Sequence, residues 1–482
     1  MNSWLRLYLR MRDTRRLLLN MAELRFELPE GLKVLLAELL SNDIKPYLVG
    51  GCVRDLILGR EPHDFDLCSA SEPLDIVKFA VENKYPYNII GIDYGTVTVF
   101  VDGVGYEITT FRKETDYTDG RHPNNVSYAS NIEEDLKRRD FTINALAYDV
   151  ENDSIIDLFD GISDIKNKNI KCVGEPSERF SEDHVRILRA IRFAVSLGFN
   201  IDDNTSKAIH KYKDKLNFVS KERITMEFEK MLSSNMPIHD IFMEYSDIID
   251  VIIPGMEECK QFNQNNKYHK HNVYEHMLYV VDYCDTKEFE IKLAALLHDI
   301  GKPASYSVDS ETGLYHFYGH PEKSYEISKR LLKDSFRLKT TEYNRILELI
   351  RFHDTSIMPN EKSIKKAMYK HGEQFVKDYV IHKEADMKDH KNMEKYVEAQ
   401  DFPTMHKLIK KILEENAAFR IKDLKVNGTE IREIAKKYEK NPTVIVGTTI
   451  RHLFDMVIDE KISNVNYLLV EEAEKFIKEQ YS

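Results

Sequence analysis

Asp64 and Asp66 are the residues of this chain whose type and spacing point most directly to metal chemistry. They follow a short apolar run, the glycine pair Gly50-Gly51 and a helix-like segment. Alternate residues of a β-strand point to the same face, so the two carboxylates are expected to lie side by side. Paired carboxylates near a glycine turn at a helix start can hold two divalent metal ions beside a triphosphate. The pattern therefore predicts a metal site next to bound phosphates.

The segment around these acids, Leu48–Leu67, combines Gly-Gly-x-Val-Arg-Asp, Leu-Gly and Asp-x-Asp in a fixed order. Asp-x-Asp alone is common and compatible with a surface turn, whereas the whole combination is much rarer by chance. It resembles the nucleotidyltransferase signature of bacterial-type (class II) CCA-adding enzymes and their poly(A) polymerase relatives. The resemblance implies that Asp64 and Asp66 bind two Mg²⁺ ions, one for the RNA 3′-hydroxyl and one for the triphosphate. It also implies phosphate-binding positions at Gly50, Gly51 and Arg54.

A strand pair is predicted downstream of the two acids. Residues 94–101 alternate in the manner of a strand, a glycine turn follows, and residues 106–112 form the second strand. Glu107 on the second strand is a candidate third carboxylate near the metals; an exposed strand glutamate is the alternative. In relatives a flexible loop comes next, and the polar segment 114–126 fits it. Its length counts against relatives that add only the two C residues, which lack part of this loop.

The segment 134–148 is predicted to be a helix, with Phe141, Ala145 and Tyr148 on one face. It resembles the second motif of the same family, Arg-Arg-Asp-Phe-Thr-Ile-Asn-Ala. In the family the arginine holds phosphates, and the aspartate and asparagine help position the sugar. The corresponding residues here are Arg139, Asp140 and Asn144.

The segment 182–193 is predicted to be a helix that begins at Ser181 as its N-cap. Asp183 and Arg186 are three residues apart and would share a face. Arginine can donate to the ring nitrogen of C or A, and aspartate can accept from the exocyclic amine that both bases carry. U and G present the opposite pattern, so the pair would repel them. The family's Glu-Asp-x-x-Arg motif serves this purpose, although a salt-bridged amphipathic helix is the alternative. Arg189 and Arg192 continue the basic side and are candidates for contact with the triphosphate or tRNA.

A second cluster of candidate metal ligands begins near residue 270. An apolar helix that ends in His298-Asp299-Ile-Gly-Lys resembles the HD phosphohydrolase superfamily. Imidazole and carboxylate ligands suit a transition metal, whose bound water can attack a phosphate. By resemblance, the ligand set is His276, His298, Asp299 and Asp386, with Asp354 as a rival for the last position. His320 and His353 are candidates for a second metal.

The composition of the 482-residue chain is that of a soluble globular protein of two to four domains, with 42% hydrophobic and 31% charged residues. Five cysteines without metal-type spacing indicate a reducing, cytoplasmic environment. No segment reaches the roughly 18 apolar residues of a membrane span. A net charge of −12 argues against non-specific coating of nucleic acid, although local basic patches can still bind RNA. Met21 is an alternative start, because residues 1–20 are unusually rich in Leu and Arg.

We therefore expect an α+β fold, with a small mixed head followed by mostly α-helical domains. The expected segments are an N-terminal extension (1–25), a nucleotidyltransferase head (26–165), a base-reading neck (166–245), an HD domain (246–395) and a helical, tRNA-binding body and tail (396–482). The expected function is template-independent addition of CCA to tRNA from CTP and ATP. Poly(A) polymerase, addition of A alone and an HD-led RNA-end phosphohydrolase remain alternatives. A non-enzymatic tRNA-binding scaffold is the least favoured.

Overall fold

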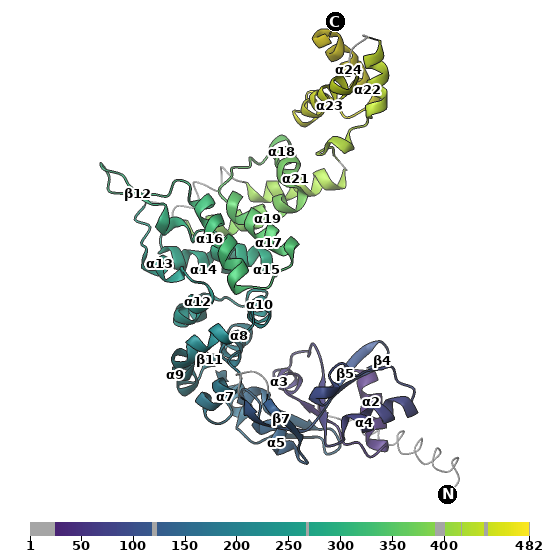
Figure 1. Cartoon of the computed structure of the whole chain (residues 1–482), viewed down its shortest axis with the longest axis vertical. Helices are drawn as coiled ribbons and strands as arrows, with labels where there is room; N and C mark the ends of the chain where they lie inside the picture. Colours follow the sequence, from purple (N-terminus) through teal and green to yellow (C-terminus); the bar gives the residue numbers. More distant parts are fainter. Residues whose placement is uncertain are drawn as a thin grey trace. The chain divides into compact units, whose positions relative to one another are not determined.

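The chain forms two compact units in a computed structural model that describes residues 25–117, 123–266, 269–390, 401–415, 417–437 and 442–481 (Figure 1). The first unit contains the chain up to Met231 together with Tyr245–Ile252. The second unit contains Leu232–Glu244 and Ile253–Ser482. The expected N-terminal extension lies outside the described residues except for Arg25. Sheet and helices are divided as expected, with a mixed α+β head followed by helices.

A seven-stranded mixed sheet forms the centre of the first unit, in the order β3-β4-β5-β2-β1-β8-β9. Its strands are β1 (Tyr47–Val49), β2 (Asp66–Ser69), β3 (Tyr87–Asn88), β4 (Thr96–Val101), β5 (Val104–Thr110), β8 (Leu146–Asp149) and β9 (Ser154–Asp157). β2 runs parallel to β5 and antiparallel to β1. The β4–β5 hairpin that the alternating pattern predicts is present. This topology brings the start of β2 beside both the end of β1 and the middle of β5.

Helices pack on this sheet through apolar faces. In α2 (Glu30–Ser41), Leu32, Leu35, Leu36 and Leu39 are fully buried, at the three- and four-residue spacing of one helical face. α4 (Pro73–Glu82) likewise buries Ile76, Phe79 and Ala80. The other short helices of the head are α3 (Gly51–Ile57), η1 (Ile92–Tyr94), α5 (Ile132–Lys137), η2 (Thr142–Asn144) and α6 (Gly161–Lys166).

The expected loop at residues 114–126 is wrong in part, because the backbone here forms a second hairpin. β6 (Arg112–Tyr117) pairs antiparallel with β7 (Pro123–Tyr128), and residues 118–122 between them lie outside the described residues.

The single helix expected over residues 134–148 is also wrong. α5 ends at Lys137, η2 follows, and residues 146–149 form β8 between β1 and β9. All four residues of β8 are buried: Leu146, Ala147 and Tyr148 are apolar, and Asp149 is paired with Lys45, so β8 is a strand covered on both faces. The Asp140 carboxylate accepts a hydrogen bond from the Phe141 amide, which supports the turn between α5 and η2.

The helix expected from residue 182 onward, with Ser181 as its N-cap, is broken in the structure. α7 (Pro176–Glu182) contains Ser181, and α8 begins only at Arg186 and ends at Leu197. Asp183 has an extended backbone between the two helices, and its side chain accepts from the Val185 amide. The remaining elements of the first unit are β10 (Asn169–Ile170), β11 (Asn200–Ile201), α9 (Asp203–Tyr212), η3 (Lys213–Phe218), α10 (Lys221–Leu232) and α12 (Ser246–Ile252).

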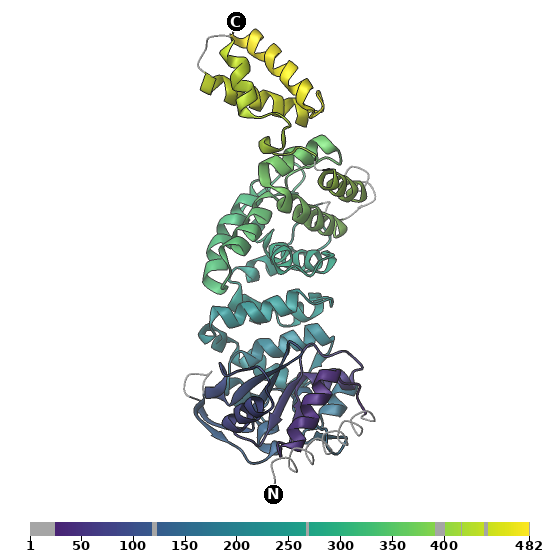
Figure 2. The ribbon, with the colours of Figure 1, turned by 90° about the vertical axis from the view of Figure 1, so that its right-hand side faces the viewer.

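Helices form nearly all of the second unit, and Figure 2 shows its last three, in yellow, packed against one another. The helices are α11 (His239–Glu244), α13 (Met256–Gln261), α14 (Val273–Tyr283), α15 (Phe289–Leu297), η4 (Lys302–Ala304), α16 (His320–Ser335), α17 (Thr340–Phe352), α18 (Glu361–His371), α19 (Glu373–Lys388), α21 (Phe402–Glu414), η5 (Ile421–Asp423), α22 (Gly428–Lys436), α23 (Pro442–Ile458) and α24 (Asn466–Tyr481). A short hairpin joins β12 (Ser307–Val308) to β13 (Tyr315–His316). Within the described ranges, every helix is too short or too polar to cross a lipid bilayer.

Candidate functional site

Three carboxylates gather at one edge of the head sheet. Asp66 is the first residue of β2, and the parallel register pairs it with Glu107 on β5. Asp64 precedes the strand by two residues, and all three side chains belong to exposed residues. The structure thus brings together Asp64, Asp66 and Glu107, the acids singled out from the sequence.

The three acids interact electrostatically. Partial burial, followed by the negative charges of Asp64 and Glu107, raises the pKa of Asp66 from 3.8 to about 6. Like charges this close disfavour ionisation of one another, and a cation placed among them relieves the repulsion. An acidic oxygen-donor set of this kind fits Mg²⁺, which prefers carboxylate and water ligands.

Gly50 connects the end of β1 to the start of α3 beside these acids. Its φ of +77° lies in the region that favours glycine. A Cβ at this position would come within 2.8 Å of Arg139 Nη1, so the end of the arginine side chain would have to move. The glycine turn therefore lets α3 begin next to Asp66, whose backbone oxygen lies 3.9 Å from Cys52 Sγ.

A continuous polar network links the glycine helix to the neck. Arg54 Nη1 donates to Asn144 Oδ1 at 2.7 Å, and Asn144 Nδ2 donates to Asp140 Oδ1 at 3.2 Å. The other Asp140 oxygen accepts from Arg189 at 2.7 and 2.6 Å. Burial alone would raise the pKa of Asp140, but Arg189 and Arg186 outweigh it and lower this pKa to about 2. The network holds Asp140 ionised and ties α3, η2 and α8 together.

Guanidinium groups surround the ring of Phe193 on α8. Arg192, Arg54 and Arg189 lie 3.9, 5.2 and 5.4 Å from the ring centroid. Arg192 also donates to Glu227 on α10 at 2.5 Å. Arg139, in contrast, pairs with the buried Asp135 at 3.0 Å. The basic residues of the two motifs are thus fixed by packing and ion pairs.

Asp183 and Arg186 do not form the shared helical face expected from their spacing. The Asp183 carboxylate accepts two hydrogen bonds from Arg223 on α10, at 2.8 and 2.6 Å. Arg186 donates from Nη1 to Glu182 at 2.7 Å and from Nη2 to the Arg138 carbonyl at 3.0 Å. Arg223 was missed by the sequence reasoning, because a partner 40 residues away leaves no local signal.

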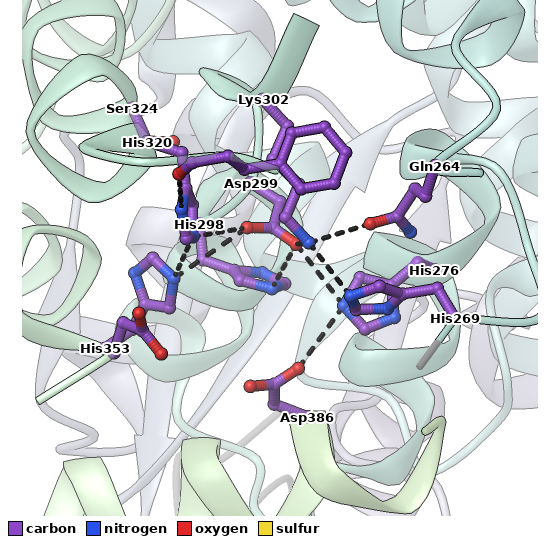
Figure 3. Close-up of polar contacts among 12 residues, drawn as sticks. Gln264, His269, His276, His298, Asp299, Lys302, His320, Ser324, His353 and Asp386 are labelled. Atoms are coloured by element: carbon purple, nitrogen blue, oxygen red, sulfur yellow. Dashed lines mark hydrogen bonds and ion pairs between the residues drawn. The ribbon is translucent and has the colours of Figure 1, made fainter. Parts of the chain in front are cut away.

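A buried carboxylate, Asp299, lies at the centre of the candidate metal cluster in the second unit (Figure 3). Its Oδ2 is 3.4 Å from His276 Nε2 and 3.2 Å from His298 Nε2. Its Oδ1 is 3.2 Å from His320 Nε2 and 3.8 Å from His353 Nε2. Each oxygen therefore faces its own pair of histidines, and the two three-residue groups share Asp299.

Each of these histidines is oriented through its other ring nitrogen. The Nδ1 atoms of His298, His320 and His353 lie 2.8, 2.8 and 2.6 Å from the carbonyl oxygens three residues before them. A carbonyl can only accept, so Nδ1 carries a proton, and Nε2 is the nitrogen that faces Asp299 and that can bind a metal ion once it is deprotonated. His276 Nδ1 makes the equivalent bond to Asp389 Oδ2 at 2.8 Å. This is the second-layer arrangement that prepares imidazoles to bind a metal ion.

The residues present fit divalent metal ions. His276 Nε2, His298 Nε2 and Asp299 Oδ1 are buried without a hydrogen-bond partner of good geometry in the described structure. Asp386 Oδ1 lies 3.3 Å from His276 Nε2, whereas the rival Asp354 has a 61% exposed side chain and faces Lys383. The geometry therefore favours Asp386 over Asp354 as the fourth ligand.

Gly301 and Lys302, in the Ile-Gly-Lys sequence after Asp299, each have a structural role in the cluster. A Cβ on Gly301 would lie 2.4 Å from the Ser324 amide nitrogen, so only glycine allows α16 to approach this turn. That approach places His320, the first residue of α16, against Asp299. Lys302 Nζ donates to Asp299 Oδ2 at 2.6 Å and to Gln264 at 2.8 Å (Figure 3). A cavity of about 600 Å³ opens over this cluster.

Asp389, Lys302 and Gln264 were missed by the sequence reasoning. Asp389 is one acid in a polar stretch after α19 and has no distinctive spacing. Lys302 belonged to the recognised motif, but its ion pair with Asp299 depends on the turn of η4.

Family models match three successive parts of the chain. Residues 46–171 match the Poly A polymerase head domain. Residues 198–259 match the "Probable RNA and SrmB- binding site of polymerase A", and residues 268–391 match the HD domain.

Curated relatives carry the name CCA-adding enzyme. The protein of Lactococcus lactis subsp. lactis is 46% identical over 204 residues, which are 42% of this chain and 50% of the relative. The protein of Pediococcus pentosaceus is 40% identical over 243 residues, or 50% of this chain and 59% of the relative. The matched part thus spans about half the length of these relatives.

Solved structures share the fold. The Bacillus stearothermophilus CCA-adding enzyme in complex with CTP has a TM-score of 0.66 at 24% identity, covering 94% of this chain and 99% of that one. The Thermotoga maritima CCA-adding enzyme complexed with tRNA has a TM-score of 0.55 at 19% identity, covering 96% and 98%. Residues 46–171 are thus similar to the Poly A polymerase head domain, residues 268–391 are similar to the HD domain, and the chain shares the fold of the solved CCA-adding enzymes.

Proposed function

We propose that this chain adds C, C and A to the 3′ end of tRNA from CTP and ATP without a nucleic-acid template. The observation that carries the proposal is the meeting of Asp64, Asp66 and Glu107 beside the Gly50 turn. Residues 46–171, which contain this site, match the Poly A polymerase head domain, and relatives named CCA-adding enzyme match 42–50% of this chain at 40–46% identity.

The carboxylates would hold Mg²⁺, which, when bound, activates the RNA 3′-hydroxyl and neutralises charge on the triphosphate. The backbone amides at the start of α3 can bind phosphate oxygens, because the first amides of a helix have no intrahelical partner. Arg54 and Arg139 border this turn through Asn144 and Gly50. Their charges would stabilise the phosphates as the bond to pyrophosphate breaks.

Base selection is assigned to Asp183 and Arg186. The Asp183 carboxylate accepts from Arg223 and retains lone pairs for further donors. The guanidinium of Arg186 carries five N–H groups, and its hydrogen bonds within the protein use three of them. The pair can therefore still accept from an exocyclic amine and donate to a ring nitrogen. Arg189 and Arg192 are proposed to support this pocket from the Phe193 side.

The test is Asp64→Ala in the full chain, assayed with labelled nucleotides on tRNA that lacks its 3′ CCA. We expect nucleotide transfer to fall below detection while tRNA binding persists. Glu61→Gln removes an exposed acid on the same loop and serves as the matched control. Transfer close to the unsubstituted level in the Asp64 variant would exclude the proposed metal site.

A second activity, metal-dependent hydrolysis of a phosphate ester, is proposed for the HD domain. The observation in its favour is the bridging position of Asp299, with two histidines at each oxygen. His276, His298, Asp299 and Asp386 would hold one ion, and His320 and His353 would hold a second. A nitrogen-rich set suits Mn²⁺, Fe²⁺, Co²⁺ or Ni²⁺ better than Mg²⁺. A bound pair of ions supplies a nucleophilic hydroxide and charge stabilisation for phosphate-ester hydrolysis.

His298→Ala tests this activity. We expect loss of phosphate release in the presence of Mn²⁺ or Ni²⁺, with CCA addition preserved. His406→Ala is the control, because this exposed histidine on α21 pairs only with Glu384 among the described residues. Unchanged phosphate release in the His298 variant would exclude the assignment, and a parallel loss of CCA addition would contradict the independence of the two activities.

A further inference from the structure

The β12–β13 hairpin is anchored to the second unit by aromatic side chains. Tyr315 in β13 and Phe317, which follows the strand, both pack against Phe262. Their rings lie 5.9 and 6.0 Å from Phe262, and Tyr306 joins the same aromatic group at 5.0 Å. The hairpin, labelled β12 in Figure 1, is therefore held by ring contacts with Phe262.

His316 and Tyr318 form a second pair of rings in the same segment. Their rings are stacked, with centroids 5.4 Å apart and planes 13° from parallel. Both residues line the cavity above Asp299, yet Tyr318 remains 78% exposed. His316 Nε2 also lies 3.7 Å from Asp309 Oδ2, a carboxylate that would attract the protonated ring. We call this stacked pair the Tyr318 platform. An exposed aromatic face that is stacked on a second ring at a cavity mouth is suited to stacking with a flat ligand.

The platform lies close to the metal cluster. Tyr318 precedes His320 by two residues, so their Cα atoms are at most about 7 Å apart. His320 Nε2 is 3.2 Å from Asp299, and Lys302 lines the same cavity. A ligand that contacts both the Tyr318 platform and the metal cluster around Asp299 needs a flat ring for the platform and, a few ångströms away, an anionic group for the cluster. A nucleotide has this construction, and the 600 Å³ cavity is within the size range of small-molecule sites.

We propose that the Tyr318 platform is a nucleobase-stacking subsite, so that the HD cavity takes a phosphorylated nucleotide with its base on Tyr318 and its phosphate at Asp299. The inference rests on the proposed phosphohydrolase activity and adds the residue that selects nucleotides over simple phosphate esters. A free nucleotide and the phosphorylated end of an RNA share this chemistry.

A local fluorescent reporter tests the subsite by binding. The chain has one tryptophan, Trp4, so Tyr318→Trp in a Trp4→Phe background gives a single emitter at the platform. The full chain, loaded with Mn²⁺, is titrated with AMP, with a short RNA that ends in a 3′-phosphate, and with ribose 5-phosphate. We expect quenching by AMP, by the RNA or by both, which identifies the source, and no quenching by ribose 5-phosphate. Absence of quenching by both base-containing ligands would overturn the proposal.

Calorimetry on Tyr318 variants separates stacking from folding effects. In an Asp64→Ala background, which removes the head metal site, Tyr318→Leu should weaken AMP binding about 5- to 100-fold, the range expected for loss of one stacked base. Tyr318→Phe, which keeps the ring, should bind nearly as the parent does, and ribose 5-phosphate affinity should not change. If His298→Ala abolishes nucleotide binding but Tyr318→Leu does not weaken it, the platform assignment fails while the hydrolase proposal stands. If no phosphorylated ligand binds the Mn²⁺-loaded parent, both fail.

Discussion

Asp66→Asn should stabilise the metal-free protein while removing nucleotide transfer. Burial and the charges of Asp64 and Glu107 raise the pKa of Asp66 from 3.8 to about 6, so its ionised form is disfavoured in the folded state. This rise in pKa corresponds to a loss of about 3 kcal/mol of folding free energy for the ionised form of a fully desolvated carboxyl. Because Asp66 is exposed, solvent screening reduces the expected effect to about 1 kcal/mol.

The sign follows from linkage between protonation and folding. A carboxyl whose pKa is raised by folding contributes stability below its unfolded pKa near 3.8, and this contribution is lost as the pH rises through about 6. The parent and the Asp66→Asn variant should therefore be equally stable near pH 4. At pH 7.5 the variant should be more stable by about 1 kcal/mol, or about 2–4 °C in the melting temperature of a unit of this size.

The assay is thermal unfolding in chelator-treated buffer at the two pH values, repeated with Mg²⁺. Mg²⁺ should raise the melting temperature of the parent, because it binds only the folded site, and should have little effect on the variant. Glu61→Gln removes the same charge outside the cluster and should shift stability by less than about 0.5 kcal/mol. A variant that is no more stable than the parent at pH 7.5 would refute the view that the acids repel one another until a cation binds.

Three further outcomes are expected. Asp140→Asn should lower the free energy of unfolding at pH 7 by about 2 kcal/mol, measured in urea titrations, because the Arg189 ion pair lowers the pKa of Asp140 to about 2. The stability that this ion pair contributes should be lost as the pH falls from 3.8 through 2. Asp183→Ala combined with Arg186→Ala should admit UTP and GTP, measured as the ratio of kcat/KM for CTP and UTP; unchanged rejection of UTP would contradict base reading by this pair. Asp389→Asn should weaken Mn²⁺ binding at the HD cluster about 10- to 100-fold in calorimetric titrations, because His276 loses its orienting carboxylate; unaltered affinity would count against the oriented-imidazole account.

The periodicity of apolar residues and the spacing of motif residues were sufficient to predict elements whose structure depends on neighbouring residues in the chain. The alternation of residues 94–101, followed by a glycine turn and a second strand at 106–112, predicted the β4–β5 hairpin, whose strands are Thr96–Val101 and Val104–Thr110. The two-residue spacing of Asp64 and Asp66 predicted two neighbouring acids on one strand; the acids do interact, but only Asp66 belongs to β2 and Asp64 precedes it. The apolar run of α15, which ends at Leu297 directly before His298, was equally clear. In each case the elements are short and close in sequence.

The features that the sequence did not predict depend on contacts between residues that are far apart in the chain. The break between α7 and α8 follows from Asp183, which caps the Val185 amide and is held by Arg223 from α10. The buried strand β8 replaced an expected helix because β1 and β9 flank it in the sheet. An apolar run of this length is compatible with either structure until its neighbours are known. The orientation of the four histidines through Nδ1 likewise depends on turns and on Asp389, which spacing does not encode.

The proposed CCA addition is tested most directly by sequencing the product formed from a tRNA transcript without its 3′ end. The full chain is incubated with Mg²⁺ and with CTP alone, ATP alone, both together, or all four nucleoside triphosphates. We predict that both nucleotides together, or all four, yield tRNA extended by CCA and no further, and that CTP alone stops after two residues. A long A tail, addition of A only to tRNA that already ends in CC, or incorporation of U and G would contradict this account.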